Sequence, residues 1–217
     1  MIKLTVSNIF KITGILILLV ILFFAWKFYI RFTPLFLHQS IVISLPFAAE
    51  DDDLIFINPM GETDHHTPPQ GHPGLDFGWS HPAPLIAVAD GKVTKIKEDS
   101  NKEYGVAEKV YDVEIVSGKF AIRYDGIAPA QNLRVGMKVK QGDVIGRGGK
   151  YEQSSGVQYS THWEFDYDTM IFDRLCPMIF FDANSEIRIN LIWNRVGQTY
   201  NGQFPEVCSG FYKGKIN

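Results

Sequence analysis

Cysteine is scarce in this sequence: the 217 residues contain only Cys176 and Cys208, and these two do not form a Cys-x-x-Cys pair. A zinc site built mainly from thiolates is therefore excluded, because such sites need closely spaced cysteines. In an oxidising compartment the two thiols can join and close a loop, which would stabilise the fold by roughly 3–4 kcal/mol. Two buried free thiols are the alternative.

Clusters of basic residues are also missing. The chain has 21 Lys and Arg residues against 24 Asp and Glu residues, which gives a net charge of −3. Because binding to phosphate groups usually needs a concentrated basic surface, nucleic acid is not an expected partner. The sequence has no internal repeat and no low-complexity tract, and 46 % of its residues are hydrophobic, so a packed domain is expected.

Charge is absent from one long stretch near the N-terminus. No residue from Ile12 to Trp26 is charged, and apart from Lys27 the apolar stretch continues to Ile30. A helix needs roughly 17–25 residues to span a bilayer, so residues 12–30 predict a single-pass membrane anchor within residues 1–31. A cleaved signal sequence is the alternative, but the next small-residue pair, Ala48-Ala49, lies far downstream. The rest of the chain is then expected outside the cytoplasm, in the periplasm or at the cell surface.

No segment after this stretch shows a helical period over three turns. Short apolar runs separated by turns predict an all-β fold of antiparallel strands from about Ser40 to the C-terminus. A strand is predicted at residues 54–57, and hairpins are predicted around Asp90-Gly91 and Ser117-Gly118. Residues 187–193 alternate like a further strand. They belong to a C-terminal extension, residues 169–217, that a Cys176–Cys208 bond would tie to the domain.

Two short motifs could carry chemistry. In the first, His72 and Asp76 stand four residues apart, and Pro73 and Gly74 between them exclude a helix. In an extended segment such residues point to the same side, so an imidazole and a carboxylate could converge on a cation. In the second, His162, Glu164 and Asp166 alternate with aromatic residues. This alternation predicts a strand with a polar stripe facing a groove and an aromatic face on the core.

The order of the motifs resembles that of the lysostaphin-type (LytM-like) zinc metallopeptidases, which cleave cell-wall peptidoglycan. That family has a His-x-x-x-Asp loop, an Ala-x-Asp-Gly-x-Val segment, a Val- and Gly-rich segment, and a His-x-His strand that ends in Phe-Glu. The matching segments of this sequence are His72–Asp76, Ala87–Val93, Val135–Gly146 and His162–Asp166. The resemblance implies a peptidase-like β domain at residues 45–168, built as a sheet sandwich or barrel-sandwich hybrid, after a linker at residues 32–44.

The resemblance also implies roles for individual residues. The family holds one zinc ion with the first His, the Asp and the second His of His-x-His, which corresponds here to metal ligands His72, Asp76 and Glu164. His162 then corresponds to the catalytic His of that motif. Gly126 stands where the family has a further catalytic His, in a Tyr-x-His-Leu segment. His65 and His66 could supply the missing imidazole if their loop folds over the site.

These departures leave different functions open. The main hypothesis is a zinc-dependent metalloendopeptidase that acts on peptidoglycan peptides with reduced activity, because losing one acid–base group typically costs about 10²–10⁴-fold in rate. The alternative is a catalytically degenerate module that binds peptidoglycan or regulates a partner hydrolase. A carrier domain of the biotinyl–lipoyl type is a third reading, based on the Val-Gly pattern around Met137-Lys138, but it leaves the His and Asp motifs unexplained.

Overall fold

The structure, a computed structural model, describes residues 6–32, 41–61, 71–99, 106–153, 156–167, 173–197 and 206–208. The chain divides into two units, residues 1–39 and 40–217. The first contains helix α1 (Val6–Phe32), whose side chains from Ile12 to Trp26 are exposed. Within the part of the chain that the structure describes, no helix is both long and apolar enough to cross a membrane.

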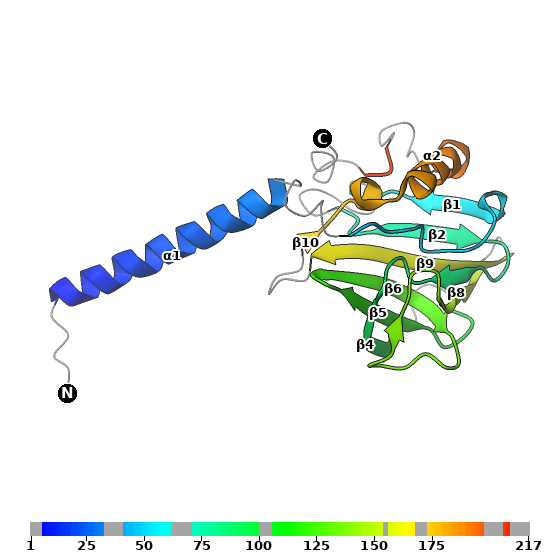
Figure 1. The fold of residues 1–217 in the computed structure, drawn as a ribbon, viewed down its shortest axis with the longest axis horizontal. Helices are drawn as coiled ribbons and strands as arrows, with labels where there is room; N and C mark the ends of the chain where they lie inside the picture. Colours follow the sequence, from blue (N-terminus) through cyan, green and yellow to red (C-terminus); the bar gives the residue numbers. More distant parts are fainter. Residues whose placement is uncertain are drawn as a thin grey trace. The chain divides into compact units, whose positions relative to one another are not determined.

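The second unit is dominated by strands, which confirms the predicted fold class at that level (Figure 1). Its described residues form ten strands: β1 (Leu54–Asn58), β2 (Leu75–Trp79), β3 (Pro84–Ile86), β4 (Gly91–Glu98), β5 (Tyr111–Ser117), β6 (Phe120–Pro129), β7 (Lys138–Val139), β8 (Val144–Gln153), β9 (Gly156–Tyr167) and β10 (Asp173–Arg174). They join in one sheet of order β1-β2-β9-β8-β6-β5-β4-β7, with β3 beside β8 and β10 beside β9. Every pair of neighbouring strands is antiparallel, as predicted. The finer arrangement as a sandwich stays a prediction.

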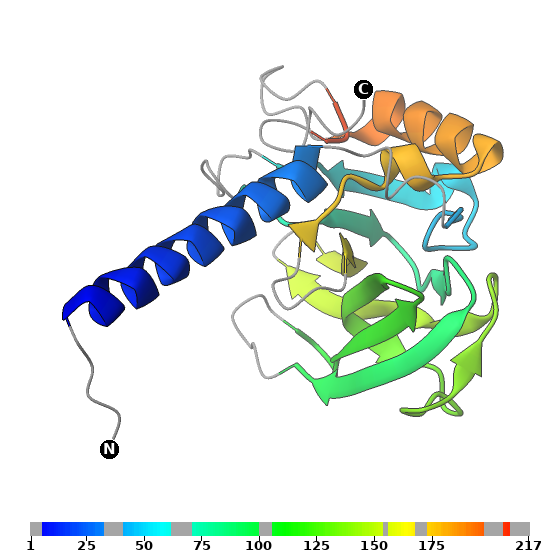
Figure 2. The ribbon, with the colours of Figure 1, turned by 60° about the vertical axis from the view of Figure 1, so that its left-hand side comes forward.

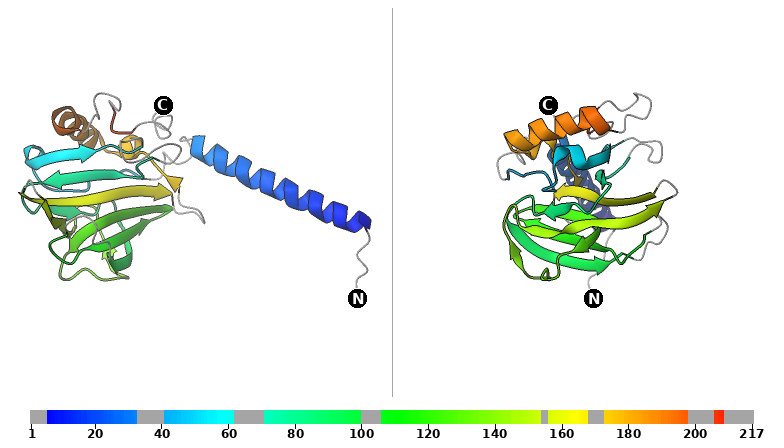
Figure 3. Two further views of the ribbon diagram at one scale, coloured as in Figure 1. Left: turned by 180° about the vertical axis from the view of Figure 1, so that it is seen from behind. Right: turned by 90° about the vertical axis from the view of Figure 1, so that its right-hand side faces the viewer.

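Strand β6 changes partner partway along its length. Residues Phe120 to Asp125 pair with β9, whereas Ile127 to Pro129 pair with β8. Gly126 lies at the change, with a positive φ of 71° that favours glycine. Strands β8 and β9 therefore both pair with β6, and Figure 3 shows the sheet from behind and from the side.

Large aromatic side chains fill the core on one face of β2 and β9. Phe77, Trp79, Trp163 and Phe165 are almost completely buried, as the predicted alternation in β9 requires. Rings stack or meet edge to face between these strands and the C-terminal segment, for example Trp163 with Phe181 at 6.2 Å between centroids. This face fixes which side chains of β2 and β9 point to the opposite side.

The C-terminal segment corrects one prediction. After the 3-10 helix η4 (Pro177–Phe180), residues 183–196 form helix α2 (Ala183–Val196) and not a strand (Figure 2). The Asp182 side chain caps the helix by accepting a hydrogen bond from the Ser185 amide at 2.7 Å. Ile189, Ile192 and Trp193 are buried at a helical spacing, and α2 packs beside β1. The apparent alternation of residues 187–193 was too short to distinguish the two periods.

One of the two predicted hairpins is also wrong. Ser117-Gly118 does connect the antiparallel pair β5 and β6, but Asp90-Gly91 does not join two paired strands. Strand β3 pairs with β8, while β4 pairs with β5 and β7. Gly91 is needed for space and not for a turn, since a β-carbon there would lie 2.8 Å from the Val116 carbonyl oxygen.

Candidate functional site

Strands β1, β2, β9 and β6 lie side by side (Figure 1), and a row of polar residues crosses them on the side opposite the aromatic core. Asn58 on β1 pairs with Asp76 on β2, Asp76 with His162 on β9, and His162 with Asp125 on β6. Directly opposed residues of antiparallel strands have β-carbons about 4.5–5.5 Å apart and share a face. The register of the sheet thereby brings together residues far apart in the sequence.

His72 reaches this row from the loop before β2. Its backbone pairs with Gly61 through two hydrogen bonds, one of them from the Gly61 amide at 2.9 Å. Gly71 has a φ of 58°, and a β-carbon there would overlap the Gly61 carbonyl, so glycine is required for this close approach. The buried His72 ring places Nδ1 2.6 Å from the Pro59 carbonyl oxygen, to which it donates, and directs Nε2 toward Asp76 Oδ1 at 3.3 Å.

The Asp76 carboxylate lies between two imidazoles. His162 Nδ1 is 2.7 Å from Asp76 Oδ1, while the Asn58 side-chain amide donates to Asp76 Oδ2 at 2.9 Å. Burial alone would raise the pKa of Asp76, but its hydrogen bonds with His162 and His72 outweigh burial and hold that pKa far below its usual range. Burial likewise disfavours charge on His162, yet its bonds to Asp76 and Glu164 raise the pKa of the imidazole to about 10.

Glu164 lies two residues after His162 on β9, and its carboxylate contacts two arginine side chains. Arg123 Nη1 donates to Glu164 Oε2 at 2.8 Å, and Arg174 Nε is 3.5 Å from Oε1. The same Oε1 lies 3.3 Å from His162 Nε2. Burial would raise the pKa of Glu164, but His162 and the two guanidinium groups lower it to about 2.

The structure groups His72 and Asp76 with His162, whereas the family resemblance grouped them with Glu164; the ligand roles stay a prediction. Among the described residues, the donor atoms of His72, Asp76 and His162 lie within 4.8 Å of one another, while Glu164 falls in a second group with Asp125 and His162. The physical reason is the strand rise of about 3.3 Å per residue, which carries residue 164 past the row of Asp76. The spacing of the motif could not show which residue of β9 lies opposite Asp76.

The donor set of His72, Asp76 and His162 fits zinc. Tetrahedral ligands at about 2.1 Å from zinc stand about 3.4 Å apart, close to the 3.3 Å between His72 Nε2 and Asp76 Oδ1. His162 Nδ1 lies 2.7 Å from the same oxygen, a hydrogen-bond distance that would have to lengthen for both atoms to bind one ion. Each ligand also has the outer partner that metal-binding side chains usually have. Pro59 orients His72, Asn58 orients Asp76, and Glu164 faces the far nitrogen of His162.

The predicted polar stripe on β9 does not face an open groove along its whole length. Asp166 is completely buried, and Arg123 Nη1 lies 3.3 Å from its Oδ2. Burial, together with the neighbouring Glu164 charge, raises the pKa of Asp166 to about 7. Arg123 also lies 3.3 Å from Glu114, so this end of the stripe is a buried charge network.

Gly126 follows Asp125, so it lies beside the polar row. Tyr151 on β8 covers it: a β-carbon at Gly126 would overlap the Tyr151 hydroxyl. Burial and nearby carboxylates, Asp76 among them, raise the pKa of Tyr151 to about 12, so the phenol keeps its proton. A hydroxyl group thus lies against Gly126, the position that the resemblance aligns with a catalytic histidine.

The histidines that could supply the missing imidazole, His65 and His66, lie outside the described residues. His81 is exposed and lies 3.4 Å from Asp53. Sequence reasoning missed Asn58, Asp125 and Arg123, whose roles come from strand pairing, and Pro59, whose carbonyl contacts His72 just after β1.

Comparisons with known proteins identify the family of the domain. The sequence profile of peptidase family M23 matches residues 70–173. No curated protein sequence matches the chain significantly. Among solved structures, a chain of the SpoIIQ–SpoIIIAH pore-forming complex is 22 % identical, covers 66 % of this chain and 93 % of its own, and has a TM-score of 0.48.

Two further solved structures are peptidases or M23 proteins by name. Lysostaphin from Staphylococcus simulans is 18 % identical over 65 % of this chain, with a TM-score of 0.42, and this chain spans 52 % of its length. A point mutant of the catalytic domain of EnpA, a prophage-encoded M23 protein from Enterococcus faecalis, is 20 % identical, with coverages of 64 % and 94 % and a TM-score of 0.42.

Proposed function

This chain carries a peptidase family M23 domain at residues 70–173, and from that premise we propose that it binds one zinc ion and hydrolyses peptide bonds of cell-wall peptidoglycan. The observation that supports this most is the convergence of His72, Asp76 and His162, each with an outer hydrogen-bonding partner. A zinc ion bound there would polarise a carbonyl group and activate water.

The ligand set that we propose changes how the family motif matches this sequence. If His162 is the second His of His-x-His, Trp163-Glu164 correspond to the Phe-Glu that ends the motif, and Ser160 corresponds to the catalytic His. His162 is then a ligand instead of the catalytic residue first expected. Both catalytic histidine positions, Gly126 and Ser160, therefore differ from the family.

The residues that remain can position a peptide without these imidazoles. Ser160 lies two positions before His162 on β9 and so faces the same side of the sheet. The Tyr151 hydroxyl lies against Gly126 beside this row. Both hydroxyl groups can donate hydrogen bonds to a bound peptide carbonyl, although neither replaces an imidazole as a proton acceptor at neutral pH. We therefore propose slow turnover.

The test is to measure zinc content and cleavage together. The purified protein should contain about one zinc ion per chain, and purified peptidoglycan treated with it should release new amino groups. His72→Ala should abolish both. A protein that takes up no zinc at neutral pH would refute the proposal.

A second candidate function is a module that binds peptidoglycan peptides or a partner hydrolase without cutting. The specific observation in its favour is the absence of an imidazole at Gly126 and Ser160. This candidate predicts zinc binding and co-sedimentation with purified peptidoglycan, but no release of amino groups even at high protein concentration.

We also propose that the domain functions outside the cytoplasm, held by an anchor at residues 12–30. The Cys176–Cys208 disulfide supports the location, because such bonds persist mainly in oxidising compartments. Thiol labelling of the unreduced protein taken from cells should find no free cysteine, and cell fractionation should place the protein in the membrane fraction. Two reactive thiols after denaturation without reductant would refute this.

A further inference from the structure

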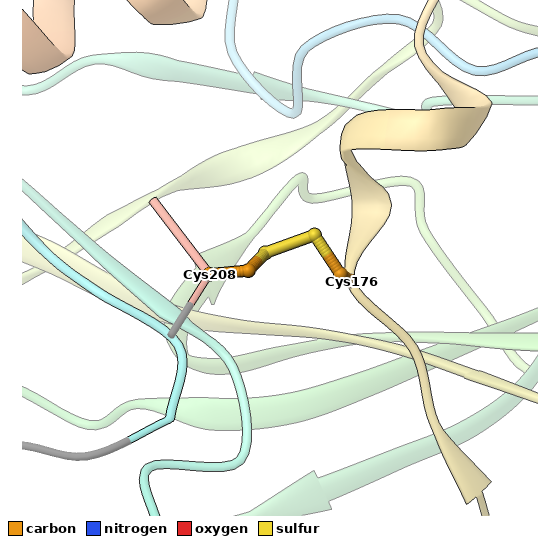
Figure 4. Close-up of a disulfide and its surroundings, with 2 residues drawn as sticks. All are labelled: Cys176 and Cys208. Carbon is orange, nitrogen blue, oxygen red and sulfur yellow. A yellow bond between two sulfur atoms is a disulfide. The ribbon is translucent and has the colours of Figure 1, made fainter. Parts of the chain in front are cut away.

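The segments outside the matched family domain connect to both histidine ligands. The disulfide joins Cys176, which follows β10, to Cys208 near the C-terminus (Figure 4). Both cysteines are completely buried, and both lie outside the matched residues 70–173. The two cysteines lie in segments that contact different parts of the domain.

The Cys208 half supports the loop of His72. The Met60 amide donates to the Val207 carbonyl at 2.9 Å, and Met60 forms a parallel bridge with Cys208. Met60 stands between Pro59, whose carbonyl accepts from His72 Nδ1, and Gly61, whose backbone pairs with that of His72. The backbone at residues 59–61 therefore contacts Cys208 on one side and His72 on the other.

The Cys176 half is attached to β9, the strand of His162. The amide of Leu175, next to Cys176, donates to the Phe165 carbonyl at 2.8 Å. Arg174 pairs with Asp166 in the short strand β10, and its side chain approaches Glu164, the outer partner of His162. One covalent bond thus links the supports of two ligands that are 90 residues apart in the sequence.

We propose that the Cys176–Cys208 disulfide is a positioning element of the metal site, which holds the His72 loop in place relative to His162. The inference rests on the proposed function, since it assumes that these residues bind zinc. Without the disulfide, the segment 206–208 can leave Met60, and Pro59 no longer fixes the ring of His72. Loss of outer-sphere support typically lowers metal affinity about 10–100-fold.

The test uses the full chain and zinc alone as the probe. Zinc affinity is measured by competition with a chromophoric chelator, and thermal stability is measured on the same samples. Cys176→Ala/Cys208→Ala should weaken zinc binding about 10–100-fold while the protein remains folded. A folded double variant with unchanged zinc affinity would overturn the inference.

A pair of glycine variants covers the case in which the cysteine variant does not fold. Gly61 and Gly118 have φ values of 108° and 60°, so alanine is strained at both. Gly61→Ala strains the backbone that pairs with His72, whereas Gly118→Ala strains the β5–β6 turn. We expect only Gly61→Ala to weaken zinc binding, although both lower stability.

The outcomes separate the two proposals. Equal zinc affinity in Gly61→Ala and Gly118→Ala, with a zinc-binding wild-type protein, would overturn the positioning role alone. A wild-type protein that binds no zinc would overturn the proposed function, and the positioning role would fall with it.

Discussion

Asp76 and His162 lie directly opposite each other on strands β2 and β9, and His162 Nδ1 is 2.7 Å from Asp76 Oδ1. The pair is 86 residues apart in the sequence, and its contact is set by the register of two antiparallel strands. The same register leaves Glu164 beyond the pair, against Arg123. This relationship makes His162 a ligand candidate and Glu164 its outer partner.

Replacing each of these two residues should distinguish a ligand from an outer partner. Glu164→Gln should weaken zinc binding about 10–100-fold, as is typical of outer-sphere changes. His162→Ala removes a donor atom and should weaken binding beyond that range. Both are measured by chelator competition. A greater loss with Glu164→Gln than with His162→Ala would restore Glu164 as the ligand.

Restoring an imidazole at Gly126 requires room that the wild-type protein lacks. Gly126→His alone should disrupt the local fold, because its β-carbon would overlap the Tyr151 hydroxyl and the positive φ disfavours a side chain. Gly126→His combined with Tyr151→Ala removes the overlap, although not the backbone strain, and should release peptidoglycan amino groups faster than Tyr151→Ala alone. A stable, more active Gly126→His single variant would show that Tyr151 does not fill this space.

Arg123 should be essential for stability and not only for the site. It approaches Glu164, Asp166 and Glu114, and these carboxylates would lose their shared cation in Arg123→Met. Removing one partner of a buried ion pair typically costs about 3–5 kcal/mol. Urea unfolding of the zinc-free protein should show a loss of this size, and adding Glu164→Gln should recover part of it. A loss below about 1 kcal/mol would mean that water already solvates the network.

Glu108 gives a prediction about pH that does not involve the proposed zinc ligands. Arg147 donates to both of its carboxylate oxygens, at 2.6 and 2.7 Å, and this pairing lowers the pKa of Glu108. Because the pKa of Glu108 is lower in the folded than in the unfolded protein, its ionised form stabilises the fold at pH values above the unfolded pKa of about 4.5. This stabilisation is lost as the pH falls through the pKa of Glu108 in the folded protein. Because solvent screens this partly exposed pair, Glu108→Gln should cost at most about 1 kcal/mol at pH 7 and progressively less below pH 4.5, as measured by urea unfolding. An equal loss at pH 7 and pH 3 would show that packing, and not charge, is responsible.

Periodicity was enough to predict the central strands but not the C-terminal helix. The alternation of aromatic residues in residues 160–167 gave β9 and its core face correctly, but not the burial of Glu164 and Asp166 on the polar face. The same criterion failed at residues 187–193, where the Asp182 cap and the spacing of Ile189, Ile192 and Trp193 were the better signals.

The sequence identified the main residues of the site but not their roles. The motif order singled out His72, Asp76 and His162, the three residues that meet in the structure. Their roles could not be assigned, since which residue of β9 faces Asp76 depends on strand register. Asn58 and Pro59 were missed because the end of strand β1 and the residue after it give no sequence sign that a side-chain amide and a backbone carbonyl there contact Asp76 and His72.

The row that crosses β1, β2, β9 and β6 also has a consequence for the order of folding. His72 and Asp76 are synthesised long before β9, which must insert between β2 and β6 to supply His162. Contacts this distant along the chain form late and slowly. A nascent chain that ends before residue 162 has two of the three donors, so high-affinity zinc uptake would report that β9 has joined the sheet.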